Sequence, residues 1–133
     1  MHRLALVLTL VAGALAGCGG SDSDSNEENV TPAQAVAEID RIRQLLDEAV
    51  ADYSAGDRNT AEETVGDAYL EHFEDVEGPL GERDHDLMEE LEEAISTELR
   101  NDMKAGEPVA EIEDSVAEIE RELDEAVAAL QGS

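Results

Sequence analysis

The clearest pattern in this chain is the stretch VAEIEDSVAEIERELDEAVAAL, which spans residues 109–130. Its apolar side chains recur every three or four residues, at Val109, Ile112, Val116, Ile119, Leu123, Val127 and Leu130. Because an α-helix has about 3.6 residues per turn, this spacing gathers them into one stripe and leaves the acidic residues on the other faces. The stretch therefore predicts a helix that packs its apolar stripe against neighbouring helices.

Three earlier segments repeat the pattern. The first follows Thr31-Pro32, a helix cap with proline at the first helical position. The apolar positions are Ile39, Ile42, Leu46, Ala49 and Tyr53 in the first segment, Ala61, Val65, Ala68 with Tyr69, Phe73 and Val76 in the second, and Leu87 with Met88, Leu91, Ile95, Leu99 and Met103 in the third. Each segment predicts one further amphipathic helix.

Short turn signals separate the four helices: Ser54 to Asp57, Gly78-Pro79 with a restart near Asp84, and Ala105-Gly106 before Pro108. Short connections make consecutive helices antiparallel neighbours. No segment alternates with the period of a strand. The sequence therefore predicts an all-α fold, an antiparallel up-down four-helix bundle over residues 31–133.

The N-terminus is typical of a signal peptide. A basic start at Arg3 precedes an apolar run over residues 4–16, which is too short for a membrane span of about 20 residues. The sequence Leu-Ala-Gly-Cys, residues 15–18, resembles the lipobox of prokaryotic lipoproteins, in which the cysteine is lipidated and becomes the mature N-terminus. The alternative is an ordinary secreted protein with a lone thiol at Cys18.

The lipobox resemblance divides the chain into three parts. Residues 1–17 are expected to be the signal peptide, and residues 18–30 the lipidated Cys18 followed by an acidic tether with no apolar periodicity. Residues 31–133 form the bundle. The expected location is outside the cytoplasmic membrane, with the chain anchored to that membrane through the lipid on Cys18.

The composition is strongly acidic: 35 Asp and Glu stand against 8 Lys and Arg, for a formal net charge of −27. Such a surface repels phosphate, so we expect no nucleic acid partner. Lys104 is the single lysine. Scarce lysine with abundant carboxylates indicates a halophilic protein, because concentrated salt screens this repulsion. The alternative is a merely acidic protein of ordinary habitat.

A few polar residues fall on the expected apolar stripes. His72 lies between Tyr69 and Val76 in the second helix, and Glu98 and Asp102 lie in the stripe of the third. An unpaired buried charge is costly, so these groups are expected to be paired, solvated or bound to a ligand. In one interpretation His72 and inward carboxylates hold a metal. In the other His72 is an ordinary core histidine, and Glu98 or Asp102 pairs with Arg43.

The densest group of candidate ligands is the run Glu71 to Glu77. At about 100° per residue, Glu74 points outward while Asp75 and Glu77 flank the core face. Height along the bundle favours Glu92 over Glu98 as the neighbour of His72. Oxygen ligands with one imidazole suit iron, manganese or, less well, zinc. The predicted metal site therefore comprises His72, Glu74, Asp75, Glu77, Glu92, Glu98 and Asp102.

No catalytic motif accompanies these residues. The sequence has no Ser/His/Asp or Cys/His arrangement, no glycine-rich phosphate loop and no calcium-loop pattern. We therefore expect a protein that is not an enzyme.

Residues 53–130 resemble a known family, the bacterial high-affinity iron permeases, in the helical extracytoplasmic domain that precedes their membrane part. The motifs that carry the resemblance are Tyr53 with Gly56-Asp57, Ala68-Tyr69, Phe73-Glu74 with Glu77, Asp86-Leu87, Leu91-Glu92 and Leu99-Arg100. The resemblance implies that Glu74 and Glu77 contact iron. It also implies that an iron permease, or another membrane transporter, is a partner.

These observations favour a lipid-anchored binding protein that serves as an accessory to the uptake of iron or another cation. No permease membrane helices follow in this sequence, so the chain is expected to hand over or sense iron and not to transport it. The alternative is a structural or protein-interaction module that binds no metal, with its acidity reflecting adaptation to salt.

Raising salt from low to molar concentration should increase the helicity of the chain, since salt screens repulsion between carboxylates. Circular dichroism and thermal melts over a salt series measure this effect. A melting temperature that does not change with salt would contradict the halophilic interpretation.

Overall fold

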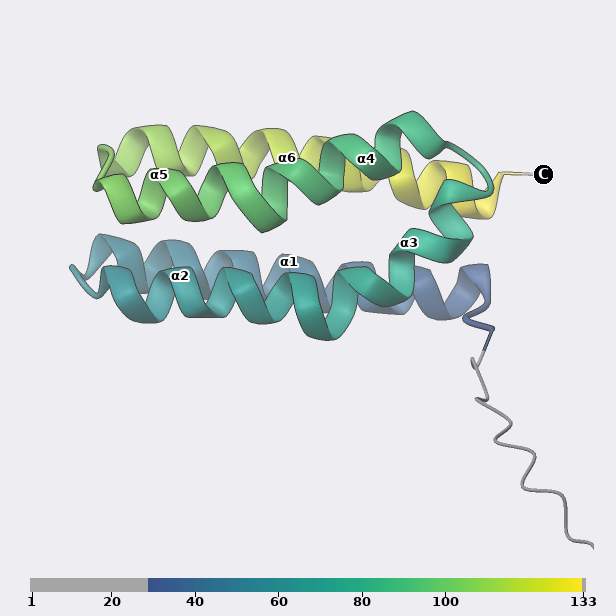
Figure 1. Cartoon of the computed structure of the whole chain (residues 1–133), viewed down its shortest axis with the longest axis horizontal. Coiled ribbons are helices and arrows are strands. Elements are labelled where there is room, and N and C mark those ends of the chain that lie inside the picture. The colour runs from purple at the N-terminus through teal and green to yellow at the C-terminus, as the bar shows by residue number, and fades with distance from the viewer. Residues whose placement is uncertain (1–28, 133) are drawn as a thin grey trace, which may run out of the picture.

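The structure, a computed structural model, describes residues 29–132, and within that range it contains helices and no strand. Four rods pack in two layers, with consecutive rods antiparallel (Figure 1). The rods are α1 (Pro32–Ser54); α2 (Arg58–Asp67), η1 (Ala68–Phe73) and α3 (Glu74–Gly81); α4 (His85–Glu93), η2 (Ala94–Glu98) and α5 (Leu99–Ala105); and α6 (Val109–Gln131). The predicted four-helix, all-α arrangement is confirmed.

Side-chain caps fix where the first three rods begin, whereas α6 begins after Pro108 without one. Thr31 accepts a hydrogen bond from the backbone N–H of Gln34 at 3.3 Å, and its own N–H donates to the Gln34 side chain at 2.9 Å. Asp57 caps α2 by accepting from the backbone N–H of Thr60, and Asp84 caps α4 in the same way. Each cap satisfies a backbone N–H that the first helical turn leaves without a partner.

Gly106 ends the third rod with a positive φ of 76°, a conformation that glycine adopts without strain. The turn also packs closely on the neighbouring end of the bundle. The Arg58 side chain lies where a Cβ at position 106 would be, and Tyr53 donates a hydrogen bond to the carbonyl of Glu107 at 2.7 Å. These contacts join the α1–α2 connection to the α5–α6 connection.

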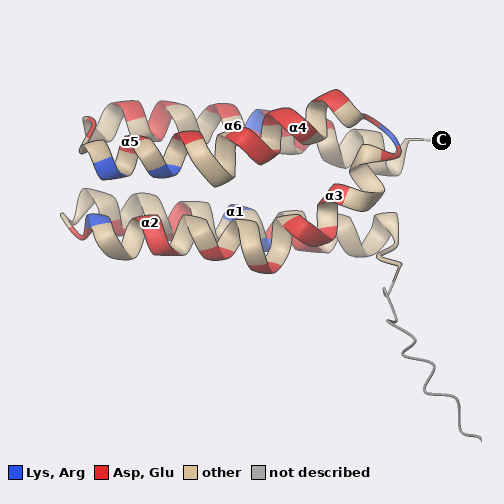
Figure 2. Cartoon of the chain, in the orientation of Figure 1, with Lys and Arg blue, Asp and Glu red and all other residues tan. Residues whose placement is uncertain are grey.

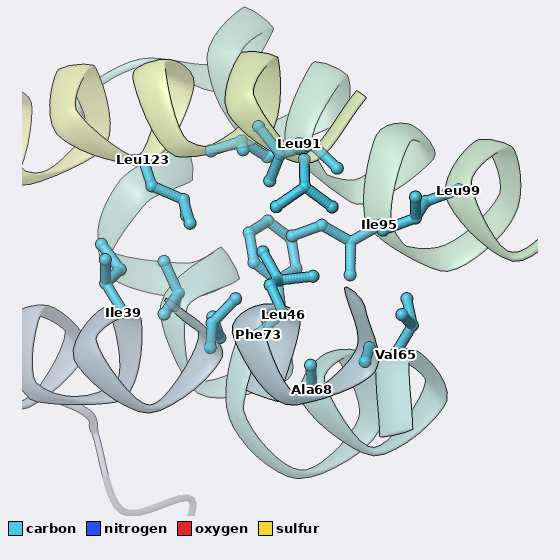
Figure 3. Close-up of a cluster of buried hydrophobic side chains, with 14 of the residues drawn as sticks. Ile39, Leu46, Val65, Ala68, Phe73, Leu91, Ile95, Leu99 and Leu123 are labelled. Atoms are coloured by element: carbon cyan, nitrogen blue, oxygen red, sulfur yellow. The ribbon is translucent and has the colours of Figure 1, made fainter. Parts of the chain in front are cut away.

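The core is built from apolar side chains alone, since no polar or charged residue within 29–132 is buried. Phe73 is the largest of the fully buried side chains, and Figure 3 shows it in the middle of the cluster with Leu91 and Ile95. From α6 the buried residues are Ile112, Val116, Ile119, Leu123, Ala126 and Leu130. The predicted stripe is thus confirmed except at its start, because Val109 is exposed, and near its end, where Ala126 is buried and Val127 half-buried.

The second and third rods each contain a stretch of π-helix, η1 and η2, which the sequence analysis missed. The step between the buried residues Ala68 and Phe73 is five residues. In a regular α-helix five residues turn about 500°, which would carry Phe73 roughly 140° away from the stripe. A π-helix takes more residues per turn because its hydrogen bonds run from i to i+5. The wider turn in η1 returns Phe73 to the core.

The two π-helical stretches also change the burial of three residues that were predicted to lie in the apolar stripes. His72 is only half-buried, because η1 turns Phe73 into the core in its place. In the third rod the buried residues Leu87, Leu91, Ile95, Leu99 and Met103 follow at intervals of four, and η2 keeps them in line. Glu98 is consequently exposed and Asp102 half-buried. The prediction that these polar residues lie within the apolar stripes was wrong.

Gly78-Pro79 does not end the second helix, contrary to the prediction. The helix α3 continues through Pro79 to Gly81, and Pro79 lies inside it. Proline lacks the N–H that would bond to the preceding turn and crowds the carbonyl there, so it favours a kink. Figure 1 shows α3 leaving the line of α2 and rising toward α4. The bend brings the side chains of α3 close to the third rod.

Ion pairs of the few basic residues join the rods. Arg43 of α1 pairs with Glu120 and, at 2.7 Å, with Asp124 of α6. The predicted pairing of Arg43 with Glu98 or Asp102 was therefore wrong. Arg100 of α5 crosses to Glu62 of α2, where its Nε donates at 2.7 Å. These pairs cross from one rod to another, whereas acidic residues occur along all four rods (Figure 2), and none of those within residues 29–132 is buried.

The N-terminal predictions lie outside the described residues. They comprise the signal peptide over 1–17, the lipidated Cys18 and the tether up to residue 28. Within residues 29–132, no helix combines the length and the apolar content that crossing a membrane requires.

Replacing Phe73 with alanine should destabilise the bundle by about 3–5 kcal/mol, because it leaves a cavity in the middle of the core. Chemical unfolding in molar salt measures the change. The matched control is Leu70→Ala in the same π-helix, where the side chain is 57% exposed and its loss should change the free energy of unfolding little. Equal effects of the two substitutions would contradict the placement of η1.

Candidate functional site

The structure does not bring the predicted ligands together as one group. Glu74 and Asp75 are exposed in α3, where both line a groove beside α1. Glu98 and Asp102 lie in the third rod and line the groove beside α6. The prediction that Asp75 flanks the core was therefore wrong, whereas Glu74 points outward as expected. Two predicted residues, Glu77 and Glu92, do meet, and they do so around Tyr69.

His72 has a partner from another helix. Its Nδ1 lies 2.6 Å from a carboxylate oxygen of Glu38 in α1, and both side chains are half-buried. The predicted neighbour, Glu92, makes its contact with Tyr69 instead. Because Glu38 lies in the first helix, nothing in the sequence near His72 could have indicated this pair. Through this contact His72 links η1 to α1.

The Tyr69–Glu77–Glu92 cluster lies where three elements converge. Tyr69 comes from η1, Glu77 from the bent helix α3 and Glu92 from the end of α4. The Tyr69 hydroxyl donates a hydrogen bond to a carboxylate oxygen of Glu92 at 3.3 Å and also adjoins the Glu77 carboxylate. The Tyr69 ring packs on Phe73, with 6.0 Å between the ring centroids. The π-turn that buries Phe73 therefore also sets the direction of Tyr69.

Glu77 is the most constrained acid of this cluster. One of its carboxylate oxygens, Oε1, has no exposed surface and no hydrogen-bond partner. Burial raises the pKa of Glu77, the nearby Tyr69 hydroxyl opposes this shift, and the negative charges of Glu92 and Glu74 add to it. A buried oxygen without a partner is costly, so protonation of Glu77 or a bound cation would stabilise this carboxylate.

The same surroundings change the pKa of Tyr69. Burial, with the nearby charges of Glu77 and Glu92, raises the pKa of the Tyr69 hydroxyl to about 12. The hydroxyl is therefore protonated at neutral pH, and its single proton serves one acceptor at a time. Two carboxylates thus share one hydrogen-bond donor.

The metal-binding capacity of the cluster is limited to oxygen donors. No three His, Cys, Asp or Glu side chains within residues 29–132 come close enough together to hold a metal ion. The cluster offers two carboxylates and a phenol, a donor set that suits hard cations. Its third donor, Tyr69, was not predicted as a site residue: the sequence placed it in the apolar stripe and in the Ala68-Tyr69 motif.

A second acidic feature is a groove of about 620 Å³ between the third rod and α6. Its acidic lining consists of Asp86, Glu89, Glu90, Glu93, Glu98, Asp102, Glu118 and Glu122. Burial raises the pKa of Glu122, and the charges of Glu90 and Glu118 add to the effect. The α1–α6 and α2–α5 contacts each have a bridging arginine, whereas no Lys or Arg among residues 29–132 lines this groove. Arg121, whose charge acts on Glu122, pairs with Glu118 of its own helix.

Comparison with known proteins gives no further guide to the site. No family model matches the chain, and neither the curated proteins nor the solved structures yield a match. The resemblance to the iron permease domain therefore stays a prediction that depends on the sequence motifs alone.

Replacing Glu77 with glutamine should stabilise the protein at pH 7 by about 1 kcal/mol, because it removes a partly buried charge beside Glu92. The pKa of Glu77 is raised above its ordinary value of 4.5, so wild-type Glu77 destabilises the fold when ionised and ceases to do so when protonated. The advantage of the variant should therefore shrink as the pH falls toward that value. Urea unfolding at several pH values measures it.

The matched control is Glu71→Gln, at an exposed position in the neighbouring turn. It removes the same charge from the chain and should leave the pH dependence unchanged. An equal gain from both substitutions would mean that general repulsion, and not the surroundings of Glu77, causes the effect.

Proposed function

We propose that this chain is a lipid-anchored binding protein, not an enzyme, which works outside the cytoplasmic membrane as an accessory to the uptake of iron or another cation. The observation that carries the proposal is the Glu77 oxygen that is buried without a partner beside a second carboxylate, Glu92. A bound cation would give that oxygen a partner and would relieve the repulsion between the two acids.

The donor chemistry supports a hard cation. Carboxylate oxygens suit magnesium, calcium and manganese, and iron also accepts oxygen donors. Glu77 is one of the two positions that the iron permease resemblance implies as iron contacts. The other, Glu74, is exposed one turn away and raises the pKa of Glu77 through its charge. It is placed to guide a cation toward the cluster, while Glu77 and Glu92 hold it.

The proposed partners follow from the sequence. The lipid on Cys18 would hold the bundle at the membrane surface, where an iron permease or another transporter could receive the cation. The surface of the bundle would concentrate cations near that point, since a strongly negative field raises the local concentration of positive ions.

A second candidate function is a structural or protein-interaction module that needs no metal. The groove between the third rod and α6 supports it, because its walls are acidic and α6 has no bridging arginine there. In this case the acidity would serve solubility in salt, and the groove would accept a basic segment of a partner protein.

Calorimetric titration of the mature domain with ferrous iron, without oxygen and in molar salt, separates the two candidates. Cation binding at the cluster predicts that Glu77→Gln weakens the affinity by about tenfold or more, as loss of a ligand should. The exposed Glu71→Gln and the His72→Ala variant should bind as the wild type does.

Two results would contradict the cation proposal. Binding that Glu77→Gln leaves unchanged would remove the site from the cluster. An absence of binding by the wild type, with manganese as well as iron, would favour the interaction module.

A further inference from the structure

Polar contacts between rods are unevenly distributed around the four sides of the bundle. Arg43 joins α1 to α6, and His72 joins the second rod to α1. On the third side, Glu62 of α2 pairs with both Arg100 and Lys104 of α5. The fourth side, between the third rod and α6, has no ion pair across it within residues 29–132. We call this fourth side the seam, and the acidic groove of about 620 Å³ lies along it.

The two ends of the seam are held differently. At one end the α5–α6 connection joins the two rods through the chain itself. At the other end Arg83, in the turn before α4, donates a hydrogen bond to the Gly132 carbonyl after α6 at 2.8 Å. In the described part of the chain, this is the sole side-chain hydrogen bond that ties α6 to the third rod or to the turn before it. Both residues are exposed, so water competes for the contact and its net contribution is small.

Like charges line the two walls of the seam. Glu90 of α4 lies on one wall and Glu118 and Glu122 of α6 lie on the other, with no Lys or Arg of residues 29–132 among the lining side chains. Burial raises the pKa of Glu122, and the charges of Glu90 and Glu118 add to this shift. Because Glu90 belongs to the opposite wall, part of this effect is repulsion across the seam. Leu99 and Ile119 also line the groove and are buried, so apolar packing closes the seam against this repulsion.

We infer that the seam is a salt-dependent opening in the bundle, closed in concentrated salt and opened in dilute salt from the end where Arg83 contacts Gly132. Repulsion between exposed charges reaches about 30 Å at 0.01 M salt but only about 3 Å at 1 M. Dilution therefore strengthens the repulsion across the seam. The same dilution strengthens the attraction of the ion pairs on other sides, such as Arg43 with Glu120, so these sides stay closed.

The opening goes beyond the proposed cation site and does not depend on it. The Tyr69–Glu77–Glu92 cluster lies between the second and third rods, and not at the seam. Opening of the seam exposes apolar side chains that are covered in the closed bundle, among them Leu99 and Ile119. Ionic strength thus controls how much apolar surface the bundle presents to its surroundings.

Pulsed electron paramagnetic resonance between pairs of spin labels tests the opening on the full chain with Cys18→Ser. One pair, His85→Cys with Ala128→Cys, spans the seam, and the control pair, Ala37→Cys with Ala128→Cys, spans the side between α1 and α6. All three label sites are exposed. As salt falls from about 1 M to about 0.01 M, the distance across the seam should increase beyond its spread at high salt, while the control distance should stay the same.

Two substitutions act on the two forces at the seam, and each has a matched control. Glu122→Gln removes repulsion, so opening should need lower salt than in the wild type, whereas Glu113→Gln, at an exposed site of α6 outside the groove, should change little. Arg83→Gln removes the bond to Gly132, so opening should begin at higher salt. Its control, Arg41→Gln at an exposed site of α1, removes the same charge and should have a smaller effect.

Four outcomes would overturn the inference. A seam distance that stays the same at low salt would exclude the opening. Equal increases in both label pairs would mean that the whole bundle loosens. Equal effects of Glu122→Gln and Glu113→Gln would show that total charge, and not charge at the seam, causes the change. If Arg83→Gln opens no more easily than Arg41→Gln, the opening does not start at the Arg83 end.

Discussion

The structure depends on one constraint: a chain dense in carboxylates must bury a continuous apolar stripe on each of four helices without burying a charge. The core satisfies this constraint within residues 29–132, where no polar or charged residue is buried. In the second and third rods a regular α-helix would break the stripe, and the π-turns η1 and η2 restore it. The cost of an unpaired charge in an apolar interior makes this local distortion the better solution.

The same distortion creates the unusual features of the surface between these rods. Because η1 turns Phe73 inward, His72 lies at the side of the helix and contacts Glu38. Tyr69 points toward Glu77 and Glu92. The contacts of these polar side chains and the packing of the core therefore both depend on η1. A substitution that returned η1 to regular α-helix would change the core and the Tyr69–Glu77–Glu92 cluster together. This is in keeping with the frequent occurrence of π-turns at functional sites.

The sequence predicted most of the fold because the fold follows from local signals. Capping residues such as Thr31, Asp57 and Asp84, together with Gly106, mark the helix ends through contacts a few residues away. Gly78-Pro79 was misleading, because proline ends a helix only where packing does not compensate for the lost hydrogen bond. The five-residue step from Ala68 to Phe73 was a readable signal of the π-turn. A count at fixed 3.6 residues per turn could not detect it.

The candidate site was less predictable, since it depends on contacts between helices. The pairing of His72 with Glu38 and of Arg43 with Glu120 is set by the relative rotation of the rods, to which the two π-turns contribute. Glu77 and Glu92 could be proposed from their residue type and height along the bundle. The contact of Tyr69 with Glu92 could not, because the direction of the hydroxyl is defined only by the packed structure.

The arrangement of the chain ends gives the bundle one more property. The first residue of α1 and the last of α6 lie at the same end, where Arg83 donates a hydrogen bond to the Gly132 carbonyl, while the α1–α2 turn lies at the other end (Figure 1). Joining residues 29 and 132 by a short linker and opening the chain between Ala55 and Gly56 would therefore keep every pair of packed rods. The order of the helices along the chain is in this sense separable from their arrangement in space.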